Sequence, residues 1–511
     1  MTETNALPFG PGAFIVIGLY VASLLAIGLY ARSKRQNETL NDFYLAGRDI
    51  GFFVLLLTLY ATQYSGNTFL GFTGAAYRNG LGFLVCVHFM TAVIVGYVVF
   101  APRLYRISRE EKFITPGDYI FFRYQSHFLR ILITLIMVFA LCNFTLAQMK
   151  TLGTAFEGIS QGQIPMWVGV VGLAIVMLIY ESLGGMRSVV WTDAVQGGIL
   201  FLGFILLSYL ALTQIGSLPD AVAKLAANPE TLHKVQAPDG DGARYWISFI
   251  LLVGLAVSIY PQAIQRIYAA RNVQTLKRSL AIMAFVPLAT GLVAVFIGVL
   301  MAAHVPGLDM QSMPDGTTKA IVPSETVLTI LCLQVMQASE FGYWTVVFIF
   351  AALLAAVMST ADSALLSIGS MITRDIYGPY IRPQADQAEL TRVGKLAAWF
   401  LMIPIVWIAL GYQGTLIQLL SIKLELLVQC APAIMLGLHC SQLNTRTVIF
   451  GIVAGILLTF GLIWAGDLGL ADHNYRKVAG FHSGIVGLAL NILICTLGIW
   501  RNRKIATMSP V

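Results

Sequence analysis

The chain has 511 residues, of which 57% are hydrophobic and only 11% are charged, and its mean hydropathy is +0.77. A soluble domain of this length carries roughly a quarter charged residues, so the composition excludes an ordinary soluble protein. The formal net charge of +7 does not indicate nucleic-acid binding, because the sequence shows no solvated basic face with interleaved aromatic residues.

Apolar stretches of about 20 residues, the length that crosses a bilayer, recur along the whole chain. They predict an all-α integral membrane protein with about thirteen transmembrane helices in a single membrane domain, residues 1–511. In chain order the expected helices centre on residues 13–31, 50–74, 81–101, 128–156, 164–180, 189–212, 246–265, 280–303, 343–373, 396–410, 416–437, 448–465 and 482–500.

Two of these spans are interrupted. Residues 61–68 read Ala-Thr-Gln-Tyr-Ser-Gly-Asn-Thr inside the second span, and Pro261 breaks the seventh. Lipid offers no hydrogen-bond partners, so unwound backbone at this depth is tolerated only where it lines a cavity or a ligand site. Paired broken helices at corresponding places in two halves of a chain point to the binding site of a transporter.

The loops predict an orientation. Most basic residues follow odd-numbered spans, and they include Arg103, Arg106, Arg271, Arg382 and Arg503. The positive-inside rule then places the N-terminus outside and the C-terminus in the cytoplasm.

The sequence does not predict an enzyme or an ATP-driven pump. The six cysteines form no Cys-x-x-Cys pair, the seven histidines have no metal-binding spacing, and no phosphate-binding glycine-rich loop is present. We expect no cofactor, and the energy for transport would come from an ion gradient.

The ten spans after the first divide into two groups of five, residues 41–214 and 245–437, followed by peripheral helices in residues 438–511. The broken spans open the two groups. An odd number of spans in each repeat forces the two repeats to be inverted relative to each other.

The chain resembles the sodium/solute symporters over nearly its whole length. The resemblance rests on a set of motifs and their order: Asp42-Phe-Tyr-Leu-Ala-Gly-Arg48, then Phe69-Leu-Gly71 and Gly74-Ala-Ala-Tyr77 after the first break, Trp191-Thr-Asp193, Pro261-Gln-Ala-Ile-Gln-Arg266, Ala355-Ala-Val-Met-Ser-Thr360 and Asp375-Ile-Tyr377. It implies the inverted five-plus-five helix fold of the bacterial leucine transporter.

The resemblance implies a sodium site, with sodium as the only metal. Its ligands would be the carbonyls of Ala61, Tyr64 and Ala356 and the hydroxyls of Ser359 and Thr360. Hard cations prefer oxygen ligands, and the last three residues share one helix face. The alternative is that the two hydroxyls only bond to the preceding helical turn.

A second ion site or an ion exit would involve Asp193, Asp362 and Ser363. The family places an acid at Asp193 near the inner sodium exit, although this residue could instead be an acid at a helix N-terminus. Asp362 stands where members with a second sodium site usually have serine. Its carboxylate could strengthen cation binding, carry a proton or pair with a basic residue.

Candidate solute-binding residues come from the two breaks: Gln63, Ser65, Gly66, Asn67, Pro261 and Gln262. Helix N-termini at such breaks favour carboxylates. The sugar branch of the family has asparagine and tyrosine where this chain has Pro261 and Ala263, and the Pro-Gln pair is closer to the Pro-His of proline, pantothenate and monocarboxylate symporters. Lys423 and Glu425 are expected at the outer end of the eleventh span.

The sequence therefore predicts a secondary-active symporter that imports a small carboxylate-bearing solute with sodium by alternating access across a bacterial inner membrane. That solute would be a monocarboxylate, an amino acid such as proline, or pantothenate. Two alternatives stay open: a proton-coupled symporter using Asp362 or Asp193, and a transporter-like sensor. The sequence fixes neither the solute, the ion count nor the oligomeric state.

Overall fold

The computed structural model describes residues 10–34, 39–160, 165–308, 311–312, 318–319, 326–412, 416–467 and 477–508. Helices make up nearly all of this part of the chain. They are α1 (Pro11–Ser33), α2 (Leu40–Leu45), α3 (Phe52–Gln63), α4 (Phe72–Asn79), α5 (Val85–Glu110), α6 (Pro116–Tyr124), α7 (His127–Ile159), α8 (Met166–Gln214), α9 (Leu218–Ala227), α10 (Gly240–Ser258), α11 (Pro261–Ala269), α12 (Val273–Met283), α13 (Val286–His304), α14 (Val327–Ala338), α15 (Glu340–Met371), α16 (Gln387–Gly411), α17 (Leu416–Leu427), α18 (Gly437–His439), α19 (Thr445–Asp467) and α20 (Ser483–Met508).

Short tight or wide helical turns and two small hairpins complete the described structure. The turns are η1 (Ala46–Arg48), η2 (Asn67–Gly71), η3 (Gly80–Leu84), η4 (Leu232–Lys234), η6 (Ile372–Ile381), η7 (Val428–Cys430) and η8 (Pro432–Leu436). Antiparallel pairs form between β1 (Gln311–Ser312) and β2 (Thr318–Lys319), and between β3 (Lys477–Val478) and β4 (Phe481–His482).

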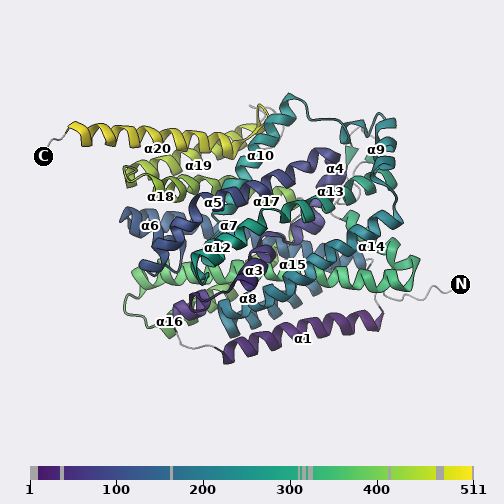
Figure 1. Ribbon diagram of the computed structural model, residues 1–511, viewed down its shortest axis with the longest axis horizontal. Helices are drawn as coiled ribbons and strands as arrows, with labels where there is room; N and C mark the ends of the chain where they lie inside the picture. The colour runs from purple at the N-terminus through teal and green to yellow at the C-terminus, as the bar shows by residue number, and fades with distance from the viewer. Residues whose placement is uncertain are drawn as a thin grey trace.

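The long helices run roughly side by side, with α1 along one edge of the bundle and α19 and α20 along the opposite edge (Figure 1). Between them lie α3, α7 and α15. Every residue of α15 from Ile349 to Met371 is buried, although this stretch contains several serines, threonines and an aspartate. A buried polar helix at the centre of a bundle is where a membrane transporter places its ion and solute path.

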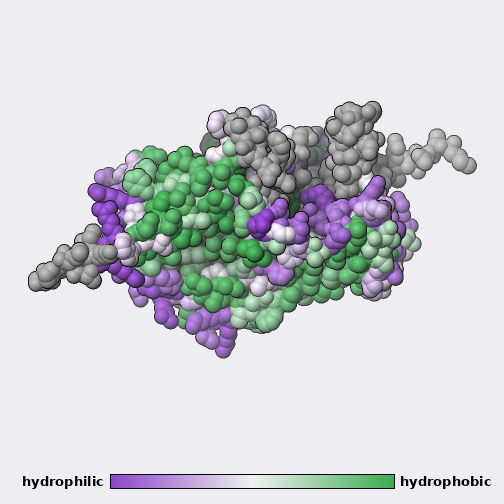
Figure 2. Space-filling model, turned by 90° about the horizontal axis from the view of Figure 1, so that it is seen from above, coloured by the Kyte–Doolittle hydropathy of each residue, from purple (hydrophilic) through white to green (hydrophobic). Residues whose placement is uncertain are grey.

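The outer surface of the bundle is apolar. Bulky side chains such as Phe53, Phe285 and Trp407 are 71–78% exposed. Figure 2 shows hydrophobic residues covering the middle of one face, with hydrophilic residues gathered toward its two ends. A surface of this kind is stable only when lipid covers it, so the protein is a multi-pass membrane protein.

The expected all-α membrane fold is confirmed, but the count of thirteen spans is not. Among the described residues, eleven helical stretches are long and apolar enough to cross a membrane, and α3 and α14 are shorter apolar helices. The difference arises because the fifth and sixth expected spans both lie in α8, while the second half of the broken span continues into α5. Gly185, with φ of 57°, marks the kink between the two parts of α8. The division into repeats stays a prediction.

Small residues let α5 and α10 approach each other closely, as is common between membrane helices. A Cβ atom on Gly254 would lie 2.7 Å from the Cβ of Ala92, and one on Gly96 would lie 2.8 Å from the Oγ of Ser258. Ser258 is the last residue of α10, so this close contact lies at the point where the second broken helix stops.

Candidate functional site

The first predicted break is confirmed between α3 and α4. Tyr64 has an extended backbone (φ −102°, ψ 101°), and the chain re-enters a helix through the wide turn η2. The freed amide of Gly66 donates to Oε1 of Gln148 in α7 at 3.1 Å. A Cβ on Gly66 would lie 2.6 Å from Cγ2 of Thr151 and 2.7 Å from Cγ2 of Val357. Only glycine therefore fits where the break passes between α7 and α15.

The second predicted break is confirmed between α10 and α11. Tyr260 has non-helical angles (φ −55°, ψ 132°), and Pro261 is the first residue of α11. Proline suits this position because its missing N–H would have no intrahelical partner there. The backbone of Ile50, just before α3, forms a β-bridge with that of Ala270, just after α11. This bridge connects the start of α3 to the end of α11.

The predicted sodium ligands of the two helices lie together. Ser359 Oγ donates to the carbonyl of Ala61 at 3.1 Å, and Thr360 Oγ1 lies 2.8 Å from the carbonyl of Ala356 and 3.5 Å from that of Ala61. All four residues are fully buried. Both hydroxyls thus bond to the preceding turn of α15 and also reach across to α3. The remaining predicted ligand, Tyr64, lies at the helix break three residues after Ala61. Carbonyl and hydroxyl oxygens of this kind are the ligands that a hard cation prefers.

A buried ionic network lies beside this cluster, centred on Arg266 of α11. Its Nη2 lies 2.7 Å from Oδ2 of Asp193 and 2.6 Å from Oγ of Ser363, and its Nε donates to Thr58 Oγ1 at 2.8 Å. Thr58 also donates to Asp193 Oδ2. The guanidinium therefore joins α3, α8, α11 and α15, and both Arg266 and Asp193 are completely buried.

The alternative that Asp193 is an acid at a helix N-terminus is wrong. Asp193 lies in the interior of α8, eight residues after Gly185, and its charge is balanced by Arg266. The role of Arg266 as the hub of this network was not apparent from the sequence. One feature of the sequence could have revealed this role. Arg266 directly follows the predicted membrane span of residues 246–265, and an arginine at membrane depth needs a buried acidic partner.

Asp362 has a different environment. Its Oδ2 accepts a hydrogen bond from the hydroxyl of Tyr180 at 2.6 Å, and Ser363 Oγ lies 3.3 Å from its Oδ1. Within the described ranges no basic residue forms an ion pair with Asp362. The expectation that it could pair with a basic residue is therefore not met there.

A small cavity lies between the two breaks. Gln63, Ser65 and Asn67 from the first break line it, together with Thr62, Phe144 of α7 and Tyr260 from the second break. Gln63 Nε2 donates to Tyr97 at 2.5 Å. The side-chain polar atoms of Asn67, Thr62 and Tyr260 have no hydrogen-bond partner among the described residues. Buried polar groups are nearly always paired, so unpaired ones around a cavity indicate a ligand site.

Three of the predicted solute-binding residues do not line this cavity. Gly66 is packed against α7 and α15, and Pro261 caps α11. The carbonyl of Gln262 accepts a hydrogen bond from Arg266 Nη1 at 3.0 Å, so Gln262 lies on the side of the ionic network. The second break contributes Tyr260 to the cavity instead.

Two broken helices around a small cavity, beside buried oxygens from a neighbouring helix, define a secondary transporter of small solutes. Comparison with known proteins identifies which kind. Residues 43–455 match the model of the sodium:solute symporter family, and the chain belongs to that family. It is therefore a transporter and not an enzyme.

Several curated relatives match over most of their length. The osmoregulated proline transporter OpuE of Bacillus subtilis is 27% identical, and 94% of each chain is covered. The sodium/pantothenate symporter of Escherichia coli is 28% identical with 94% of each covered. The sodium/glucose cotransporter of Vibrio parahaemolyticus is 27% identical over 86% of this chain and 83% of that protein.

A solved structure has the same fold. It is the substrate-bound outward-open state of a Na+-coupled sialic acid symporter, which superposes with a TM-score of 0.76 over 96% of this chain and 98% of that chain. The two sequences are only 19% identical, so the match shows the fold alone.

Proposed function

We propose that this protein imports a small carboxylate-bearing solute together with sodium by alternating access. The solute class comprises monocarboxylates, amino acids such as proline, and pantothenate, and sodium is the coupling ion, with no further cofactor. The observation that carries the proposal is the convergence of the Ser359 and Thr360 hydroxyls on the carbonyls of Ala61 and Ala356 at the end of α3.

In this proposal the same geometry links sodium binding to solute binding. Sodium held by Ala61, Tyr64, Ala356, Ser359 and Thr360 would tie the end of α3 to α15. Thr62, Gln63 and Ser65 follow Ala61 directly in the chain and line the cavity. Sodium would therefore order the solute site, and solute would strengthen sodium binding by the same factor, because the coupling of two binding sites is reciprocal.

The ionic network favours one sodium per cycle. Asp193 and Ser363 were the candidates for a second ion site, and the guanidinium of Arg266 already lies 2.7 Å and 2.6 Å from their oxygens. The positive charge of Arg266 therefore occupies the position that a second sodium ion would need. For Asp193 to serve the ion exit, Arg266 would have to move aside.

Proton coupling is the second candidate, and Asp362 is the residue that favours it. A buried carboxyl whose neighbours are the hydroxyls of Tyr180 and Ser363 is a chemically suitable proton carrier. Uptake would then follow the pH gradient even when sodium is equal on both sides.

Orientation follows from the basic loops: we place the N-terminus outside and the C-terminus in the cytoplasm, with the protein in the cell (inner) membrane. In support, α1 begins at one end of the bundle and α20 ends at the other (Figure 1), as an odd number of crossings requires.

The test is uptake into proteoliposomes under an imposed sodium gradient, a potassium control and a proton gradient. Lactate, pyruvate, acetate, proline, pantothenate and glucose would be supplied as labelled solutes. We expect sodium-dependent accumulation of a carboxylate or amino acid, abolished by Ser359→Ala with Thr360→Ala. Thr345→Ala is the matched control, because this hydroxyl of α15 donates to the carbonyl of Phe341 in its own helix at 2.8 Å and has no other partner among the residues that the structure describes.

Other outcomes separate the alternatives. Accumulation driven by protons alone would assign coupling to Asp362 or Asp193. Binding of a solute with no accumulation under any gradient would identify a sensor. Sodium-driven uptake of glucose alone would overturn the carboxylate class.

A further inference from the structure

Lys423 is a fully buried lysine near the solute cavity. It lies in α17, seven residues after the helix begins at Leu416, and its exposed fraction is 0%. The expectation that it sits at the outer end of its span is therefore wrong. Its Nζ has no hydrogen-bond partner in the residues that the structure describes, and no ion pair with it is found there.

The rings beside Lys423 do not balance its charge. Its Nζ lies 3.5 Å from the ring centroid of Phe144 and 5.6 Å from that of Tyr260. Cation–π contacts with two rings offset only part of the cost of burying an ion, even after relaxation of the surroundings. Glu425 is two residues away, and residues at i and i+2 do not share a helix face. The ammonium still needs an anion.

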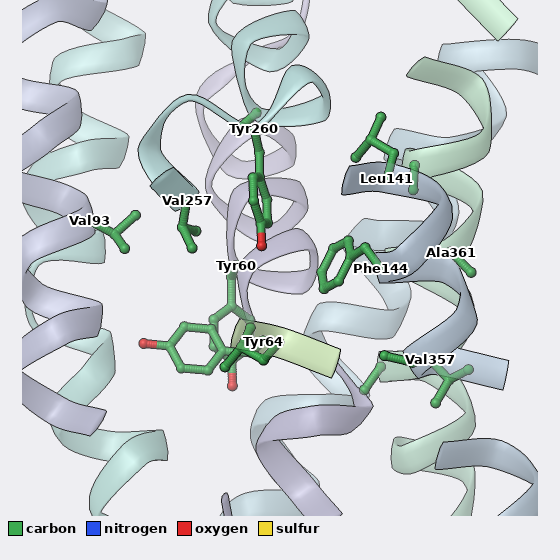
Figure 3. Close-up of a cluster of buried hydrophobic side chains, with 14 of the residues drawn as sticks. Tyr60, Tyr64, Val93, Leu141, Phe144, Val257, Tyr260, Val357 and Ala361 are labelled. Atoms are coloured by element: carbon green, nitrogen blue, oxygen red, sulfur yellow. The ribbon is translucent and has the colours of Figure 1, made fainter. Parts of the chain in front are cut away.

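Lys423 lies directly behind the wall of the cavity between the helix breaks, in contact with two of the residues that line it. Phe144 and Tyr260, the two rings that it contacts, both line that cavity. Leu420 also lines it and lies three residues before Lys423, on the same face of α17. Figure 3 shows the side chains of Phe144 and Tyr260 close to each other, with Tyr60 and Tyr64 beneath them.

We propose that Lys423 is the anion-binding residue of the solute site, and that its ammonium pairs with the carboxylate of the bound solute beside the rings of Phe144 and Tyr260. The inference rests on the proposed transport of a carboxylate and adds the residue that recognises it. An ammonium is a strong partner for a carboxylate in a dry site, because a charge-assisted hydrogen bond is about twice as strong as a neutral one.

The cavity also limits the size of the solute. Its volume is about 40 Å³, and about 10–15 Å³ is needed to hold one water molecule. The free space is of the order that a few water molecules fill, so within the proposed class it favours the smaller monocarboxylates. Phe144 and Val257 provide apolar walls for its body, while Asn67 and Thr62 offer unpaired polar groups to a hydroxyl or keto oxygen.

The experiment compares Lys423→Met with the wild type in proteoliposomes under a sodium gradient. Lactate, pyruvate and propionate are each paired with the corresponding uncharged amide. Removing one partner of a buried charge pair costs about 2–5 kcal/mol, so we expect the half-saturating concentration of the carboxylate to rise by about 30-fold or more. The wild type should prefer each acid to its amide, and this preference should vanish in Lys423→Met.

Lys395→Met is the matched control, because Lys395 also has its ammonium over an aromatic ring, that of Phe43 at 5.0 Å, but this ring does not line the cavity, whereas the rings of Phe144 and Tyr260 do. We expect it to keep the wild-type half-saturating concentration. Carboxylate uptake by Lys423→Met with wild-type affinity would overturn the role of Lys423 and leave the proposed function standing. Absence of sodium-driven carboxylate uptake in the wild type would instead overturn the proposed function. Should Lys423→Met fail to fold, equal wild-type affinity for acid and amide would still overturn the inference.

Discussion

Gly66 is the residue on which the first helix break depends. Its amide donates to Gln148, and a Cβ at this position would lie within 2.7 Å of side-chain carbons on both α7 and α15. Because Thr151 and Val357 are β-branched and buried, neither can turn away freely. The backbone at the break can therefore approach both helices only when residue 66 has no side chain.

We predict that Gly66→Ala destabilises the protein by about 1–3 kcal/mol, the usual cost of overpacking a well-packed site. The added methyl group would push the break away from α15 and separate Ala61 from Ser359. The thermal midpoint in detergent and the sodium concentration at half-maximal uptake both report this change. We expect the midpoint to fall and the sodium requirement to rise.

Gly198→Ala is the control for this substitution. It lies in α8, and a Cβ there would meet no atom within 4 Å. Alanine favours a helix by about 1 kcal/mol over glycine, so stability should stay level or increase. Wild-type sodium dependence in Gly66→Ala would show that the break tolerates a side chain and would contradict this account.

At the scale of elements, α6, α7 and η6 are joined by a buried aspartate. Asp375 of η6 accepts from Thr115 Oγ1 at 2.7 Å, from Thr134 Oγ1 at 3.1 Å and from Arg130 Nη2 at 2.8 Å. Asp118 of α6 lies 3.2 Å from the same guanidinium. This cluster fixes the end of the α15–η6 helix against the rest of the bundle.

We predict that Asp375→Asn lowers the free energy of unfolding by about 1–3 kcal/mol, because Thr115, Thr134 and Arg130 lose their charged acceptor in a buried site, while Asp118 still balances the charge of Arg130. Thermal unfolding in detergent measures the loss. Asp49→Asn is the control: its pair with Arg271 is 2.6 Å long but lies at the surface, with both side chains more than half exposed. Exposed pairs contribute about 0–1 kcal/mol, so the two variants should differ clearly, and equal midpoints would contradict the role of Asp375.

How much could be predicted from the sequence depends on whether a feature arises from neighbouring residues or from residues far apart in the chain. The breaks follow from local chemistry at Gly66 and Pro261, and the spacing of Ser359 and Thr360 places them on one helix face, so these features were predictable. The partners of Arg266 lie 73 residues away in Asp193 and 97 away in Ser363. Such pairings depend on how helices pack, and no periodicity encodes them.

The contact between Lys423 and the aromatic rings was missed for the same reason. Its immediate neighbours in sequence, Ile422 and Leu424, are apolar, which is equally consistent with a lysine that extends to the membrane surface. Only the packing of α17 against α7 and the second break shows that its side chain is buried beside the cavity.

For the whole molecule, the charge of the transported species determines how the proposed cycle responds to the membrane potential. Arg266 and Asp193 pair with each other, and Lys423 in our proposal pairs with the solute. These protein charges stay within the transporter, so the net charge moved in the proposed cycle is that of sodium plus solute. One sodium ion and one monocarboxylate carry no net charge together, and the potential then does no work on the cycle.

We therefore predict that a tenfold sodium gradient, worth about 1.4 kcal/mol, accumulates a monocarboxylate about tenfold whether or not a potential is imposed.

A proton carried on Asp362 would change this result. The translocated charge would become +1, and 100 mV would add about 2.3 kcal/mol, or about 50-fold further accumulation. Accumulation ratios measured in proteoliposomes with and without a potassium diffusion potential distinguish the two cases. A strong dependence on potential that disappears in Asp362→Asn would mean that both sodium and a proton drive uptake, whereas independence in the wild type supports one sodium ion per carboxylate.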